Sequence, residues 1–134
     1  MVAIKEIKKD LLMSKSTNER SLKAEIDIMR SINHPSIIKL HSVYENEVYV
    51  YLVMEYIDGG SLRELVRATR KLDEPVAKKF TLQILNAVKY LHSKQIIHRD
   101  IKLGNILISG NKDMTIKICD FGLSCASGAT GNET

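Results

Sequence analysis

The chain has 134 residues, a length typical of one domain. Hydrophobic residues make up 44% and charged residues 27%, as in an ordinary globular protein. The net charge of +4 comes from lysines interspersed with acidic residues, without the dense basic cluster that nucleic-acid binding needs. The longest apolar run, Val48 to Met54, is far shorter than the roughly 20 residues that span a bilayer. We therefore expect neither nucleic-acid binding nor membrane insertion.

The N-terminus lacks the apolar stretch and the small-residue cleavage site of a secretory signal. The two cysteines, Cys119 and Cys125, match no zinc-ligand spacing and cannot form a disulfide framework. These features predict a protein of the reducing cytoplasm.

The first part of the chain predicts three strands and one helix. Residues 2–7 are rich in β-branched side chains and favour a strand. Apolar residues at helical spacing predict a helix over about 18–31, and Pro35 ends it. Two further apolar segments, 37–43 and 48–54, favour strands joined by a polar turn.

The second part is mostly helical. The glycine-containing break at 58–60 precedes a short helix over 61–69. An apolar stripe predicts a long helix over about 75–93, with a proline at its start. Two short strands, 106–108 and 115–118, follow around a turn.

Residues 124–134 contain almost nothing apolar and are expected to form a mobile tail. The order of elements predicts an α+β fold in two parts. These parts cover about 1–57 and 58–134, with a cleft where they meet.

Two motifs in the second part carry the chemistry. Residues 98–105 read His-Arg-Asp-Ile-Lys-Leu-Gly-Asn, so one loop presents a carboxylate, an ammonium and a carboxamide. These groups can orient a hydroxyl, neutralise a phosphoryl group and bind a metal ion. Residues 120–122 read Asp-Phe-Gly and add a second metal ligand from a separate segment.

This pair of motifs resembles the eukaryotic protein kinases. The resemblance covers almost the whole chain but only part of that family's domain, since Gly-x-Gly-x-x-Gly and Ala-Pro-Glu motifs do not occur in it. It implies a truncated bilobal fold, with part of the small β lobe and its helix followed by the start of the large lobe, ending in the activation segment.

The implied function is an ATP-dependent serine/threonine kinase, which transfers the γ-phosphoryl group of Mg-ATP to a hydroxyl of a protein substrate. The alternative is an inactive truncated module that binds nucleotide or a partner protein. The resemblance leaves both open.

The resemblance also implies roles for the motif residues. Asp100 orients the substrate hydroxyl, and Lys102 meets the charge of the γ-phosphoryl group. Asn105 and Asp120 bind Mg²⁺ through oxygen atoms.

A lysine and a glutamate complete the implied phosphate site. Lys5 lies on the first predicted strand, and Glu25 follows on the predicted helix, near the face that carries Leu22 and Met29. The resemblance pairs them beside the α- and β-phosphates of ATP. The alternative for Glu25 is an ordinary surface charge on the helix.

The segment after the third strand is the implied adenine site. The carbonyl of Glu55 and the N–H of Ile57 would bind the adenine edge, and Met54 would border the back of the pocket. Ala3 and Leu107 would enclose the ring by apolar contact. The alternative for these apolar residues is a place in the core.

The resemblance also implies a hydrophobic stack. In the family, the residues at the positions of His98 and Phe121 stack with those at the positions of Met29 and Leu40.

Arg99 precedes Asp100. A cation at such a position is often countered by a phosphorylated loop residue, which orders the loop. The candidate hydroxyls are Ser124, Ser127, Thr130 and Thr134.

Subgroup features are mixed. Segments 34–40, 51–56 and 118–124 resemble calcium/calmodulin-dependent and calcium-dependent kinases, whereas 59–62 and 98–102 are more similar to Ste20-type kinases. Lys102 favours serine/threonine over tyrosine specificity. Kinases that prefer basic substrates often have glutamates at two positions that are Ser61 and Gly104 here, which weighs against such a preference.

Overall fold

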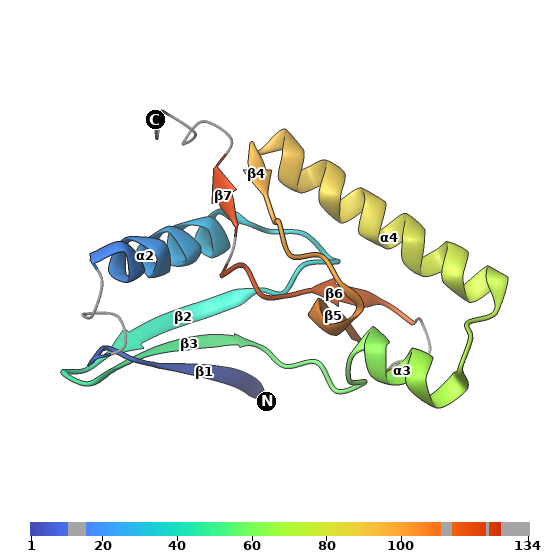
Figure 1. Ribbon diagram of the computed structural model, residues 1–134, viewed down its shortest axis with the longest axis horizontal. Helices are drawn as coiled ribbons and strands as arrows, with labels where there is room; N and C mark the ends of the chain where they lie inside the picture. The colour runs from blue at the N-terminus through green and yellow to red at the C-terminus, as the bar shows by residue number, and fades with distance from the viewer. Residues whose placement is uncertain (11–15, 111–113, 123, 127–134) are drawn as a thin grey trace.

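The computed structural model describes residues 1–10, 16–110, 114–122 and 124–126. The first part is a three-stranded antiparallel sheet with the order β1-β3-β2, made of β1 (Val2–Lys8), β2 (Leu40–Glu45) and β3 (Tyr49–Glu55). Helix α2 (Ser16–Ser31) lies along this sheet (Figure 1).

Packing of α2 on the sheet follows from its apolar spacing. Leu22 lies against Val50 and Leu52 of the central strand, β3, and all three side chains are buried. Burying such side chains favours folding by about 1.5–3 kcal/mol each. The helix therefore presents one face to the sheet, and Glu25 lies on that side.

The second part begins with two helices, α3 (Leu62–Thr69) and α4 (Glu74–Ser93). Ser61 caps α3, because its hydroxyl accepts a hydrogen bond from the Glu64 N–H while the Glu64 carboxylate accepts one from the Ser61 N–H. This reciprocal arrangement satisfies two helix-terminal donors.

In the part of the chain that the structure describes, no helix is long and apolar enough to cross a membrane.

Short strands hold the loops of the second part. Strands β5 (Ile106–Ile108) and β6 (Ile116–Ile118) form one antiparallel pair. Strand β4 (Ile96–Ile97) pairs with β7 (Cys125–Ala126), and a 3-10 turn, η1 (Leu103–Asn105), precedes β5.

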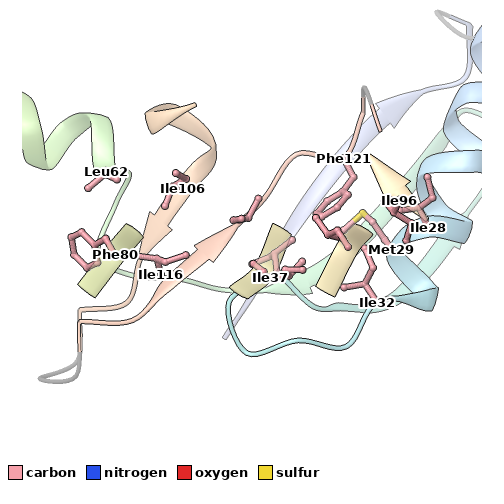
Figure 2. Packing of buried hydrophobic residues seen from close by; sticks show 14 of the residues in the cluster. Ile28, Met29, Ile32, Ile37, Leu62, Phe80, Ile96, Ile106, Ile116 and Phe121 are labelled. Carbon is pink, nitrogen blue, oxygen red and sulfur yellow. The ribbon is translucent and has the colours of Figure 1, made fainter. Parts of the chain in front are cut away.

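One buried cluster joins the two parts (Figure 2). Met29 of α2 and Phe121 lie together near Ile37, while Phe80 of α4 packs near Ile116 of β6. The cluster extends from α2 to α3, so one core supports both sides of the joint. The α+β, truncated bilobal fold is confirmed, whereas the proposed boundary near residues 57 and 58 stays a prediction.

Two predicted elements differ from the structure. The strand expected over 37–43 begins only at Leu40, because Ile37 forms a parallel bridge with Ile118 instead. The tail expected over 124–134 is wrong at its start, because Cys125 and Ala126 pair with β4. Backbone pairing does not require apolar side chains, so the polar composition gave no sign of it. Residues 127–134 lie outside the described part of the chain.

The break between the two parts depends on a glycine. A Cβ added to Gly59 would lie 2.1 Å from the carbonyl oxygen of Ile108, which is backbone and cannot move away alone. Beside it, the Ile108 N–H donates to the carbonyl of Gly60, and the Gly110 N–H donates to the Asp58 carboxylate. The segment after β3 is thus fixed against the end of β5.

We expect Gly59→Ala to lower the free energy of unfolding by about 1–3 kcal/mol, the usual cost of forcing extra atoms into a packed site. Thermal or urea unfolding monitored by circular dichroism measures this loss. Thr69→Ala, at an exposed position of α3, is the control and should change stability by about 0.5 kcal/mol or less. Equal stability of the two variants would contradict this explanation of Gly59.

Candidate active site

A cavity of about 390 Å³ lies where the two parts meet. Its apolar wall includes Ala3 of β1, Met54 of β3, Ile57 and Leu107 of β5. The charged side chains of Lys5, Glu25 and Asp120 also line it. An apolar cavity of this size with a few polar groups is typical of small-molecule sites.

Lys5 and Glu25 form an ion pair in this cavity, with 2.9 Å between Lys5 Nζ and Glu25 Oε1. The Glu25 side chain is only 10% exposed, whereas that of Lys5 is 41% exposed. A buried carboxylate is costly without a partner, so Lys5 compensates the charge of Glu25. In return, Glu25 fixes the direction in which the lysine points.

Asp120 reaches the cavity from a strained backbone. Its φ is 64°, in the left-handed region that is uncommon for residues other than glycine. Phe121, the next residue, is fully buried in the core beside Met29, which anchors the segment. Asp120 is itself exposed, so burying the phenylalanine turns the aspartate toward solvent and the cavity.

The buried His98 ring connects the two motifs. Its Nδ1 accepts a hydrogen bond from the Asp100 N–H at 3.2 Å, so its Nε2 carries the proton and donates to the Cys119 carbonyl at 3.0 Å. The ring also meets Phe121 edge-on, with 4.7 Å between centroids. His98 thus fixes the backbone of Asp100 relative to the strand that leads to Asp120.

The Asp100 carboxylate is surrounded by donors from its own loop. Lys102 Nζ donates to both of its oxygens, at 3.0 and 2.9 Å. Asn105 Nδ2 donates to Asp100 Oδ2 and to the Asp100 carbonyl, both at 2.9 Å. The three side chains therefore form one cluster, although they come from positions 100, 102 and 105.

These contacts favour the ionised form of Asp100. The hydrogen bond from Lys102 lowers the pKa of Asp100 below its ordinary value of 3.8, and the bond from Asn105 lowers it further. At neutral pH the carboxylate is therefore an acceptor only.

The predicted site residues fall into two groups. Eight line the cavity: Ala3, Lys5, Glu25, Met54, Glu55, Ile57, Leu107 and Asp120. The other three are Asp100, Lys102 and Asn105, which form the loop cluster. The groups are connected through the backbone, since the Asn105 carbonyl accepts a hydrogen bond from the Cys119 N–H at 2.9 Å.

Cys119 is a cavity residue that was not predicted. Alternation along the strand could have indicated it, because Ile118 points into the core and its neighbour must face the other way. Burial raises the pKa of the Cys119 thiol to about 11, so it stays protonated at neutral pH. It contributes an uncharged surface beside Asp120.

The backbone carbonyl of Glu55 is the group expected to bind adenine, and the Glu55 side chain makes different contacts. Its carboxylate pairs with Lys117 Nζ at 2.8 Å and accepts a hydrogen bond from the Lys39 N–H at 3.2 Å. This ion pair joins β3 to β6 and so supports the joint between the two parts.

Only one of the four candidate phosphorylation hydroxyls can be placed. The Ser124 hydroxyl donates a hydrogen bond to the Phe121 carbonyl. Ser127, Thr130 and Thr134 lie outside the described residues, so loop phosphorylation stays a prediction.

A larger hollow of about 610 Å³ lies between α2 and the ends of β2 and β3. Its apolar floor includes Leu22 and Val50, and charged side chains of both signs surround it. None of the motif residues reaches it. We therefore place the candidate site in the smaller cavity.

Comparison with known proteins identifies the family. The protein kinase domain model matches residues 1–133. NUAK family SNF1-like kinase 2 of Homo sapiens is 44% identical over 124 residues, which is 92% of this chain and 19% of that protein. CBL-interacting serine/threonine-protein kinase 16 of Arabidopsis thaliana is 40% identical over 123 residues, or 92% of this chain and 26% of that protein. The chain belongs to the protein kinase family.

A third relative, the serine/threonine-protein kinase DCLK3 of Mus musculus, is 41% identical over 124 residues, or 91% of this chain and 15% of that protein. The chain thus spans about a quarter or less of the length of these relatives. The names of the Arabidopsis thaliana and Mus musculus relatives agree with the serine/threonine type that Lys102 indicated. The resemblance to calcium-dependent kinases is not confirmed by them.

We expect Lys102→Met to raise the pKa of Asp100 toward 3.8, because the substitution removes the donor that most favours the carboxylate. Carboxyl-carbon NMR during an acid titration measures the change. Lys39→Met, at an exposed position just before β2, is the control and should leave the pKa of Asp100 unchanged. An unaltered titration in Lys102→Met would show that the contact does not persist in solution.

Proposed function

We propose that the chain forms the central part of an ATP-dependent serine/threonine protein kinase, which transfers the γ-phosphoryl group of ATP to a protein hydroxyl. The observation that carries this proposal is the environment of Asp100. A carboxylate offers about four lone-pair sites, and Lys102 and Asn105 occupy three of them. One site on Oδ1 remains for a substrate hydroxyl.

That remaining site suits the transfer of a phosphoryl group. Such reactions gain mostly from positioning and charge neutralisation and little from strong base catalysis. An ionised Asp100 that accepts one more hydrogen bond can orient the serine or threonine oxygen. Lys102 places a positive charge beside the same point.

The cavity fits a nucleotide. Ala3, Met54 and Leu107 provide apolar surfaces for a flat ring, and the backbone of Glu55 and Ile57 provides polar groups at the edge. Lys5, held by Glu25, provides the cation for the phosphates at the charged end. When bound, ATP supplies the phosphoryl group that is transferred.

The donor atoms near this end also fit Mg²⁺. Asp120 offers carboxylate oxygens, and Asn105 keeps its amide oxygen free for a ligand because its Nδ2 makes the contacts with Asp100. Hard oxygen donors suit this ion, which binds few protein groups and keeps several waters. The described residues include no cluster of three or more His, Cys, Asp or Glu that could hold a metal ion.

The proposed substrate is a protein with an accessible serine or threonine, and the proposed location is the cytoplasm. The alternative, an inactive module with the same fold, would bind nucleotide or a partner protein without transferring a phosphoryl group. The experiment below distinguishes the two functions.

We expect Asp100→Asn to reduce phosphorylation of a serine peptide by about 100-fold or more in the full-length protein, because the carboxamide is uncharged and cannot orient the hydroxyl in the same way. Asp73→Asn, at an exposed position before α4, is the matched control and should keep full activity. Transfer is measured with radiolabelled ATP.

Lys5→Met should weaken ATP binding by about tenfold or more, since a charged hydrogen-bond donor is lost. Isothermal titration calorimetry measures the affinity, with Lys78→Met as the control on the exposed face of α4. ATP binding by the unsubstituted full-length protein without any transfer would favour the binding module. Unchanged transfer in Asp100→Asn would refute the role of Asp100.

A further inference from the structure

A guanidinium group lies directly beside the loop that carries Asp100. Arg63, in the first turn of α3, approaches Gly104 so closely that a Cβ added there would lie 3.3 Å from its Cζ and Nη2 atoms. Gly104 belongs to η1, between Leu103 and Asn105. A side chain at position 104 would push the guanidinium away by a few tenths of an ångström, so the glycine leaves it room to lie against the loop.

Arg63 has no acidic partner in the described part of the chain. None of the five ion pairs there involves it, and its side chain is exposed. The nearest acid in sequence, Glu64, is engaged elsewhere, because its carboxylate accepts hydrogen bonds from the N–H and the hydroxyl of Ser61. The positive charge of Arg63 therefore stays available for a ligand.

Arg63 lies close to the Asp100 carboxylate, where the serine or threonine hydroxyl of a substrate would bind. Gly104 precedes Asn105, whose amide contacts the Asp100 carboxylate at 2.9 Å. One residue of chain spans about 3.8 Å, so Gly104 lies roughly 10 Å or less from that carboxylate. An extended substrate advances about 3.3 Å per residue, which brings side chains about two to four residues from the acceptor within reach of Arg63.

We propose that Arg63 selects substrates with an acidic side chain a few residues from the phosphorylated serine or threonine. The inference rests on the proposed kinase function and adds a substrate class to it. Gly104 assists as a positioning residue, because it leaves room for the guanidinium next to the loop.

An acidic group is the chemistry that fits a guanidinium. Its planar set of N–H donors matches the two oxygens of a carboxylate, and a phosphate binds in the same way. A basic substrate residue would instead meet like charge from both Arg63 and Lys102. Because Arg63 is exposed, the contact should be modest and sensitive to salt.

The test uses peptides with a central serine and a single glutamate at each of the neighbouring positions, each matched by a peptide with glutamine there. For the full-length protein we expect kcat/KM for the best glutamate peptide to exceed that of its glutamine match about two- to fivefold at low ionic strength. This ratio should fall toward one in Arg63→Gln and invert in Arg63→Glu. Arg20→Gln, which removes an exposed arginine of α2, is the charge-matched control and should keep the ratio.

Binding of the same peptides, measured by fluorescence anisotropy, separates this proposal from the kinase assignment. Charge-dependent binding that is lost in Arg63→Gln, without any phosphorylation, would support the role of Arg63 and refute the kinase function. The role of Arg63 would be overturned if Arg63→Gln kept the same glutamate preference in phosphorylation or binding. It would also be overturned if the unsubstituted protein showed no glutamate preference. A retained ratio at high ionic strength would also contradict it.

Discussion

The parallel bridge between Ile37 and Ile118 is the contact on which the site depends. The Ile38 N–H donates to the Ile118 carbonyl, and the Ile118 N–H donates to the Ser36 carbonyl, both at 2.9 Å. Both bridged side chains are buried, so these backbone groups have no water to replace a lost partner. Because Asp120 follows Ile118 by two residues and Ile38 lines the cavity, the bridge holds these two parts of the cavity wall together.

The loop around Asp100 is ordered by side chains and not by a regular element. The buried His98 satisfies one N–H and one carbonyl, and the Asn105 amide holds both the backbone and the side chain of Asp100. Removing either group would leave buried polar atoms without partners, which costs about 1–3 kcal/mol for each. The geometry of Asp100 is therefore supported by residues that need not touch any substrate themselves.

The sequence predicted the features that depend on residues close together in the chain, such as helical faces. Helical spacing placed Glu25 near the helix face that carries Leu22 and Met29, whereas its pairing with Lys5 was implied by resemblance to the family. The structure joins the two side chains at 2.9 Å. The pairing of Ile37 with Ile118 and of β7 with β4 could not be predicted, because strand partners far apart in sequence leave no periodic signal in either segment. Arg63 was missed for a related reason: an exposed charge on a helix looks the same whether it faces solvent or a loop. The roles given to the motif residues came from resemblance to the family, not from pattern.

The two lysine–carboxylate contacts of the site have the same length and different environments. Lys5 and Glu25 meet at 2.9 Å with the carboxylate almost buried, so separating them would leave a charge without water. Lys102 and Asp100 also meet at 2.9 Å, but their side chains are 50% and 22% exposed. Water competes for such a pair, and exposed pairs contribute only about 0–1 kcal/mol. The first lysine is therefore fixed in place, whereas the second can leave its carboxylate at little cost when another negative group arrives beside it.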